Sequence, residues 1–216
     1  LFRSCVDQTN YLGCADLIAW NKYFDWSNGD KIGPFMDNVK MNSKNYPVGV
    51  SEYGFGGSVK QHLCPLNDIE KPLGRLHPEE FQAISHEKNW KALFERPYLW
   101  AKFIWVFADF QSMIRKEGDR DGINDKGLVT YDRKEKKDAF YFYKANWNPE
   151  PMLHLCDKRF KERNHTNVNI KVYTNLKEAT LYLNGRKVSR LKRDDYNRIE
   201  WKGVTLQLGK NTIKVE

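Results

Sequence analysis

Short apolar runs recur through the first two thirds of the chain, and each has the length of one buried strand. Four of these runs predict strands, at residues 4–9, 16–21, 47–52 and 102–107. Between the last two, residues 78–96 open with a proline and two acids and end before Pro97, which predicts a helix. Residues 138–147 fit a final helix, although their aromatic residues also suit a strand.

The pattern changes after the proline-rich segment 149–151. Short β-type runs replace the helices, and Asn184-Gly185 is a typical two-residue hairpin turn. The strands expected here are residues 169–173, 179–183, 186–188, 204–208 and 212–215. We therefore expect two domains, residues 1–148 with alternating strands and helices and residues 149–216 as a small all-β sandwich.

The alternation of strands and helices predicts a parallel sheet, in which ligands gather at the carboxyl ends of the strands. Polar and aromatic side chains stand at those ends: Asn21 and Tyr23 after the second run, Glu52 at the end of the third, and Trp105 and Asp109 at the end of the fourth. These residues are the candidates for a common site.

Glu52 has the most informative surroundings of the five. A short apolar run ends in this carboxylate, and Tyr53, Gly54, Phe55, Gly56 and Gly57 follow it. The glycines allow the backbone to turn away from the strand at little steric cost. An acid at a strand end usually meets only solvent, so the segment by itself does not establish a catalytic role.

The composition narrows the function classes. The net charge is +8, but acids alternate with the basic residues, as in residues 132–138, and this is typical of a solvated surface. We therefore expect no nucleic-acid partner. No run approaches the roughly 18 apolar residues of a membrane span.

Metal and cofactor binding have little support in the sequence. The four cysteines and five histidines lack the spacing of metal ligands, so we expect free, partly buried thiols, no metal and no cofactor. The chain begins at Leu1 without an initiator methionine, which predicts that residues precede it. The localisation is left open.

Four segments in order resemble family 2 glycoside hydrolases of the β-galactosidase and β-glucuronidase group. They are residues 15–23, 50–54 (Val-Ser-Glu-Tyr-Gly), 103–110 and 122–133. The resemblance continues into the β domain and implies an α/β fold, namely the C-terminal half of a (β/α)8 TIM barrel followed by a small immunoglobulin-like sandwich. It also suggests a periplasmic or secreted location.

In this family the resemblance implies a retaining mechanism with two carboxylates. Glu52 matches the nucleophile, and Tyr23 matches a tyrosine that hydrogen-bonds it. Asn21 is expected to orient a carboxylate or a sugar hydroxyl, and Trp105 to form the aromatic floor of the sugar site. Asp109 is expected either to bind a sugar hydroxyl or to hold the following loop.

The segment with Asn124 and Lys126 is compatible with two substrates, a β-glucuronide and a β-galactoside. In β-glucuronidases an Asn-x-Lys pair grips the substrate carboxylate. The same segment also resembles the loop after the last barrel strand of bacterial β-galactosidases, together with Arg115, Glu117 and Gly118. The β-galactoside is the preferred prediction, and the β-glucuronide is the alternative.

The expected partners follow from the parts of the family's catalytic barrel that these residues do not contain. The Asn-Glu motif that carries the acid/base is absent from these residues, and a half-barrel leaves unpaired sheet edges. We therefore expect a carbohydrate substrate, completion by a missing N-terminal part of the same polypeptide, or a homo-oligomer that closes the barrel. A noncatalytic piece that only binds carbohydrate or a partner is the remaining alternative.

Overall fold

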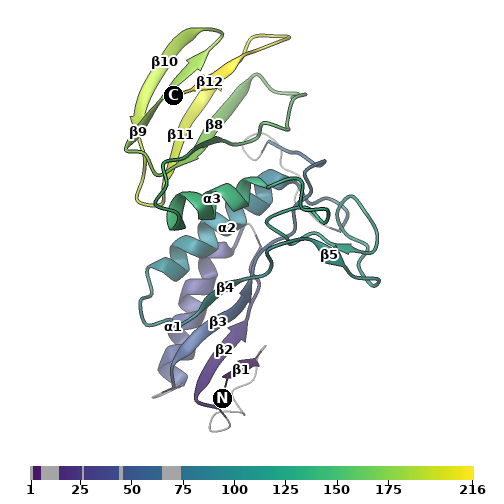
Figure 1. The fold of residues 1–216 in the computed structure, drawn as a ribbon, viewed down its shortest axis with the longest axis vertical. Helices are drawn as coiled ribbons and strands as arrows, with labels where there is room; N and C mark the ends of the chain where they lie inside the picture. Colours follow the sequence, from purple (N-terminus) through teal and green to yellow (C-terminus); the bar gives the residue numbers. More distant parts are fainter. Residues whose placement is uncertain (1, 6–14, 26, 44–45, 65–73) are drawn as a thin grey trace.

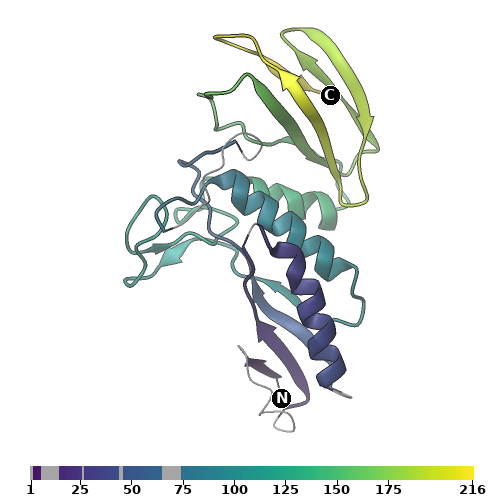
Figure 2. The same ribbon diagram turned by 180° about the vertical axis from the view of Figure 1, so that it is seen from behind.

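A computed structural model describes residues 2–5, 15–25, 27–43, 46–64 and 74–216. A parallel sheet lies at the end of the molecule that holds the N-terminus, an antiparallel sandwich lies at the other end, and α2 and α3 lie between them (Figures 1 and 2). No helix among the described residues is both long and apolar enough to cross a bilayer.

The parallel sheet has the order β1-β2-β3-β4, so each strand pairs with the next one in the chain. Its strands are β1 (Phe2–Cys5), β2 (Leu17–Asn21), β3 (Val48–Tyr53) and β4 (Lys102–Ile104). The predicted strands at residues 16–21 and 47–52 are confirmed. The first is observed only over residues 2–5, since residues 6–9 lie outside the described part. The fourth is shorter than predicted and ends before Trp105.

Three helices accompany this sheet: α1 (Ile32–Asn42), α2 (Glu79–Phe94) and α3 (Asp138–Trp147), with a short 3-10 turn, η1 (Gly29–Lys31), before α1. The helix predicted at residues 78–96 is confirmed as α2, and residues 138–147 are a helix. The apolar faces of α1 and α2 pack on strand residues such as Val48 and Val50 in one core.

The sequence pattern predicts no helix for α1. Its first turn contains Gly33 and Pro34, which lower helix propensity elsewhere. The first turn tolerates proline because its N–H groups have no intrahelical partner there.

The sandwich consists of two antiparallel three-stranded sheets with the orders β11-β8-β7 and β10-β9-β12. Its strands are β7 (Leu153–Leu155), β8 (Asn167–Thr174), β9 (Glu178–Leu183), β10 (Arg186–Lys192), β11 (Arg198–Thr205) and β12 (Ile213–Val215). The predicted hairpin joins β9 to β10, with positive φ angles of 51° at Asn184 and 79° at Gly185. The strand predicted at residues 204–208 is wrong in its bounds, because β11 begins at Arg198 and ends at Thr205.

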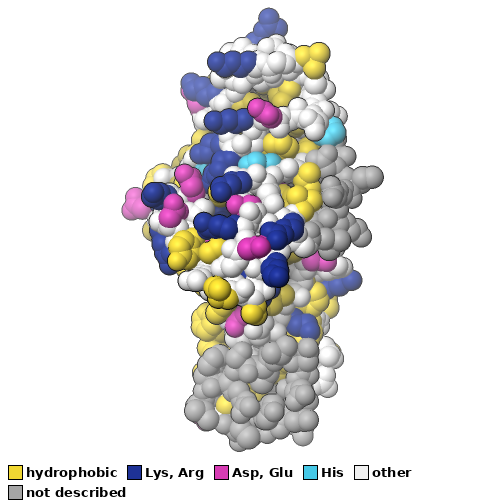
Figure 3. Space-filling view, turned by 90° about the vertical axis from the view of Figure 1, so that its right-hand side faces the viewer, with side chains coloured by type: hydrophobic (Ala, Val, Ile, Leu, Met, Phe, Trp, Pro, Cys, Tyr) yellow, Lys and Arg dark blue, Asp and Glu magenta, His cyan; other side chains and the backbone are white. Residues whose placement is uncertain are grey.

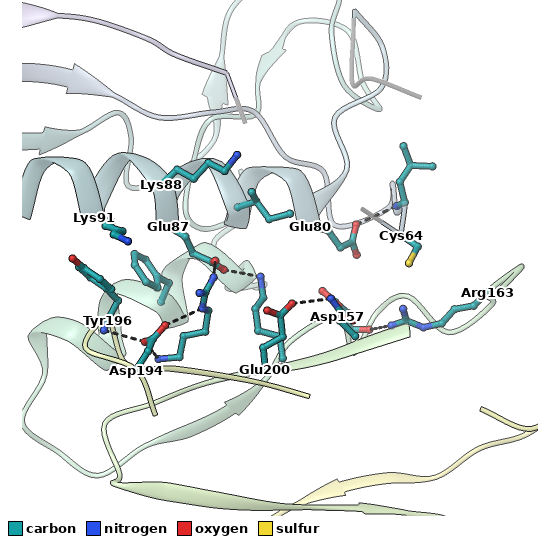
Figure 4. Close-up of a pocket in the computed structure, with 16 residues that line it drawn as sticks. Cys64, Glu80, Glu87, Lys88, Lys91, Asp157, Arg163, Asp194, Tyr196 and Glu200 are labelled. Atoms are coloured by element: carbon teal, nitrogen blue, oxygen red, sulfur yellow. Dashed lines mark hydrogen bonds and ion pairs between the residues drawn. The ribbon is translucent and has the colours of Figure 1, made fainter. Parts of the chain in front are cut away.

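The sandwich and the helices meet through a buried ionic contact on α2 (Figure 4). Glu87 receives hydrogen bonds from Lys171 of β8 at 2.6 Å and from Arg198 of β11 at 2.7 Å, and also from the Tyr173 hydroxyl. Burial by itself would raise the pKa of Glu87, but Lys171 and Arg198 outweigh burial and lower it. The carboxylate therefore stays charged and ties the two ends of the molecule together.

The charged run at residues 132–138 is only partly a solvated surface. Residues 132–136 are exposed as predicted, but the prediction is wrong for Lys137 and Asp138, which are fully buried. Lys137 donates to Asp109 at 2.8 Å, and Asp138 accepts from His154 at 2.8 Å. Charge alternation alone does not show which charges find a buried partner.

Candidate active site

The candidate site begins where β2 and β3 end side by side. Asn21 and Glu52 are paired in register at the carboxyl ends of these strands. Lys22, the residue that follows β2, donates its backbone N–H to the Glu52 carbonyl at 3.0 Å. The Glu52 side chain is half-buried. The sheet therefore holds the backbone of Glu52 in place while part of its carboxylate stays accessible.

Tyr23 contacts that carboxylate directly. Its hydroxyl donates a hydrogen bond to Glu52 Oε2 at 2.8 Å. Burial, the hydrogen bond and the negative charge of Glu52 together raise the pKa of Tyr23 far above its usual range, although Arg115 opposes the shift. The phenol thus stays protonated and remains a donor, as the sequence resemblance implies.

Trp105 lies against Tyr53 and Gly54, the two residues that follow Glu52, because the backbone of Trp105 approaches closely there. The Trp105 N–H donates to the Tyr53 carbonyl at 2.8 Å, and a Cβ added at Gly54 would sit 2.4 Å from the Trp105 carbonyl oxygen. Only glycine fits there. The indole is half-buried and meets Phe110 edge-on at 5.8 Å between ring centroids. The role of Trp105 as the aromatic floor of a sugar site stays a prediction.

Lys126 reaches the same group from the loop after β6 (Ile123–Asn124). Its ammonium lies 5.9 Å from the centroid of the Tyr23 ring and 3.5 Å from Glu117 Oε1. Arg115 donates to both oxygens of Glu117, at 3.1 and 3.3 Å. Two cations thus share the Glu117 carboxylate beside Tyr23, whose hydroxyl in turn contacts Glu52.

Asn124 and Asp109 are more deeply buried than Lys126 and hold the loop that carries it. Asn124 Oδ1 accepts the Lys126 N–H at 3.1 Å, and Asp109 Oδ1 accepts the Gly127 N–H at 2.8 Å and the Lys137 ammonium. Burial raises the pKa of Asp109, while Lys137 opposes this. Of the two roles expected for Asp109, these contacts favour support of the loop.

Two elements of the site were missed by sequence reasoning. Glu117 was noted only as part of a loop, and nothing in its spacing shows that it pairs with Arg115 and Lys126. The buried Lys137 stands in a run of exposed charges. The signal that could have indicated Glu117 is the polar loop between β5 (Phe110–Gln111) and β6. These two short strands pair with each other, and the pairing brings the residues of the loop together.

One buried group outside this site has the donor types of a metal centre. Asp138, His154 and Cys156 place one donor atom each within 4.8 Å of one another. Both oxygens of Asp138 already accept hydrogen bonds, from His154 and from the Asp157 N–H. Burial raises the pKa of the Cys156 thiol. The group therefore joins the start of α3 to β7 through protein contacts alone.

Comparisons with known proteins point to glycosidases. Over 201 residues the chain is 43% identical to a β-glucuronidase of Bacteroides fragilis, an alignment that covers 92% of this chain and 29% of the relative. A crystal structure of an FMN-binding β-glucuronidase from Facaelibacterium prausnitzii L2-6 matches with a TM-score of 0.87 and 32% identity, over 100% of this chain and 33% of that one. A provisionally named β-galactosidase from Bacteroides fragilis matches with a TM-score of 0.83 and 31% identity, over 93% of this chain and 30% of that one.

Residues 165–216 also match a family model described as a domain of unknown function, DUF4982. The chain spans about a third or less of the relatives named above. The chain is therefore similar to part of glycosidases named β-glucuronidase or β-galactosidase, the group that the four sequence segments resemble. All three curated relatives that match are named β-glucuronidases, one of them provisionally.

Proposed function

We propose that this chain supplies the nucleophile of a retaining family 2 glycoside hydrolase, with Glu52 in that role. The observation that carries the proposal is the 2.8 Å hydrogen bond from Tyr23 to Glu52 at the end of β3. A carboxylate at a strand end that is held by a protonated phenol is ready to attack without losing its charge.

The chemistry proceeds in two displacements. A Glu52 oxygen attacks the anomeric carbon, the bond from that carbon to the leaving oxygen breaks, and a general acid protonates the leaving group. Water, deprotonated by the same group, then attacks the anomeric carbon, and the bond from that carbon to the Glu52 oxygen breaks. The Tyr23 hydroxyl stabilises the carboxylate before attack and after release. The acid/base lies outside these 216 residues, about 5 Å from Glu52 in the assembled site.

The fold supports a matching structural proposal. Four parallel strands in sequential order, with Glu52 and Asn21 at their carboxyl ends, correspond to strands five to eight of a (β/α)8 barrel. Residues 1–148 form that half-barrel, and residues 149–216 form an immunoglobulin-like sandwich. The missing half of the barrel is the partner that carries the acid/base.

The substrate that we propose is a β-glucuronide. Lys126 shares the Glu117 carboxylate with Arg115 and lies 5.9 Å from the centre of the Tyr23 ring, so its ammonium is placed to meet an anionic substituent of a sugar bound at Glu52. The Asn124 contact to the Lys126 N–H fixes the loop that presents the ammonium. The names of the relatives point the same way.

Replacing Lys126 with alanine tests this substrate in a polypeptide that carries the chain and the acid/base segment. A hydrogen bond to a charged group contributes about 1.5–3 kcal/mol, so kcat/KM for nitrophenyl β-glucuronide should fall about 10- to 100-fold. The value for nitrophenyl β-galactoside should change less than about threefold. The exposed Lys136→Ala is the matched control. A wild-type protein that prefers the galactoside contradicts the substrate, and one that folds but cleaves neither supports a noncatalytic binding role.

Replacing Tyr23 with phenylalanine tests the contact to Glu52. Loss of a donor to a charged acceptor should lower kcat about 10- to 100-fold with little change in KM, because the hydroxyl acts on the nucleophile. Tyr131→Phe, an exposed phenol on another loop, is the control. Steady-state kinetics check the prediction, and an unchanged kcat would show that the contact has no catalytic role.

A further inference from the structure

The sandwich carries a groove that the proposed active site does not use. It encloses 610 Å³ between the loop after β7 and the loop between β11 and β12. Aliphatic side chains from both sheets and from the loop between β11 and β12 line it: Leu155, Ile170, Leu206 and Ile213. None of the seven candidate active-site residues lines it. A sheltered apolar floor of this kind suits a ligand with C–H faces rather than a fully hydrated ion.

The charged residues that line the groove are mostly basic. Lys158, Lys161 and Arg163 stand on one wall and Lys210 on the other, against the single acid Asp157. Lys171 also lines the groove, but Glu87 pairs with it. Figure 3 looks onto the side on which both loops lie, and its upper part has more dark blue basic side chains than magenta acidic ones.

These cations are available to a ligand. Lys158, Lys161 and Lys210 are exposed, and among the described residues no ion pair joins any of the three to a carboxylate. The Arg163 guanidinium contacts a backbone carbonyl at 3.3 Å and lies 4.3 Å from the centre of the Phe160 ring. Among the described residues, three lysine charges thus face the groove without an ion pair to a carboxylate, and Arg163 adds a fourth positive charge next to Asp157.

Because the lysines are exposed, the groove favours a chain with repeated negative charges over a small anion. One exposed lysine paired with one anion changes affinity at most about fivefold, because water and salt screen the contact. A small anion held at a single point would therefore bind weakly. A chain with repeated negative charges engages both walls at once, and each contact after the first is intramolecular.

The surroundings of Phe160 favour an acidic polysaccharide over a single-stranded nucleic acid as the polyanion. Single-stranded nucleic acids bind by stacking bases on open aromatic faces. The Phe160 ring stacks against His62 at 5.4 Å and against Arg163, so neighbouring side chains occupy it. The rest of the lining combines aliphatic side chains, which suit the C–H faces of sugar rings, with the amides of Asn169, Gln207 and Asn211, which suit hydroxyl groups. We propose that this groove binds an acidic polysaccharide strand built of uronate residues; the uronate identity rests on the proposed function.

The test uses the Glu52→Gln background of the longer polypeptide, so that no probe is consumed. The probes are a (1→4)-β-linked glucuronate hexasaccharide and cellohexaose, which differ only in carboxylate against hydroxymethyl groups. Calorimetry should detect the glucuronate oligomer and not cellohexaose. The triple variant Lys158→Gln, Lys161→Gln, Lys210→Gln should weaken binding about tenfold or more, and the salt dependence should become shallower.

The matched control removes three exposed lysines of the same domain outside the groove, Lys187, Lys192 and Lys202, each replaced by glutamine. It should change affinity less than about twofold. Equal losses in both triple variants, binding of cellohexaose, or tighter binding of a single-stranded oligonucleotide would overturn the proposal. Glucuronide hydrolysis by the parent without Glu52→Gln is measured separately, so failure of the groove and failure of the enzyme are distinguishable.

Discussion

Glu52→Gln is expected to abolish glycoside hydrolysis. The amide cannot attack the anomeric carbon, so kcat for nitrophenyl β-glucuronide should fall about 10⁴-fold or more in a polypeptide that carries the acid/base. The fold should survive, because the amide has nearly the shape of the carboxylate and still accepts the Tyr23 hydrogen bond. Steady-state kinetics measure the loss.

The control is Glu150→Gln, an exposed acid in the segment between α3 and β7, which should leave kcat unchanged. A mechanism-based fluoroglycoside should label Glu52 of the wild-type enzyme, and peptide mass spectrometry locates the ester. Label on another carboxylate, or more than about a tenth of the activity left in the glutamine variant, would remove Glu52 from the nucleophile role.

Glu87→Gln is expected to be the most destabilising single change that we predict. The carboxylate is buried and faces Lys171, Arg198 and the Tyr173 hydroxyl. Removing the charge takes the carboxylate away from the buried Lys171, while Arg198 keeps its ion pair with Asp194 at 3.2 Å, and we expect a cost of about 3–5 kcal/mol of unfolding free energy. Urea denaturation measures it. The exposed pair Arg190–Glu178 is the comparison, and Glu178→Gln should cost less than about 1 kcal/mol.

The pH dependence of the Glu87→Gln effect has a fixed sign. Because folding lowers the pKa of Glu87, its contribution is complete above the unfolded pKa of about 4.3 and is lost as the pH falls through the lower folded value. The difference in stability between wild type and Glu87→Gln should therefore be constant near neutral pH and shrink in acid. A difference that grows in acid would show that Glu87 is not the charged partner.

Much of the site was predictable because parallel strands place their ends at one edge. Two short apolar runs, each followed by polar residues, were enough to predict that Asn21, Tyr23 and Glu52 lie together. The helix α3 was ambiguous because aromatic residues satisfy both periodicities. The packing of α3 against α2 and the sandwich favours the helical conformation.

The substrate could not be read from the sequence with the same success. Asn124 and Lys126 occur in a segment that fits two kinds of loop, and the proposed β-glucuronide rests in part on where the ion pair with Glu117 places Lys126. Such a contact depends on how β5 and β6 pair, and spacing along the chain does not report it. The prediction that Lys137 is exposed was wrong for the same reason. The burial of this lysine depends on its ion pair with Asp109, which the sequence does not show.

The ionic contact at Glu87 also bears on how such proteins exchange modules. Tyr173 of β8 and Cys156 pack in the same core as α2 and α3, so the hydrophobic boundary does not coincide with the proline-rich segment 149–151. A chimera cut at that segment would part Glu87 from Lys171 and Arg198 and open this core. A unit that can be transplanted as a whole has to include α3 and the face of α2 that carries Glu87. The junction for recombination therefore differs from the proline-rich segment 149–151.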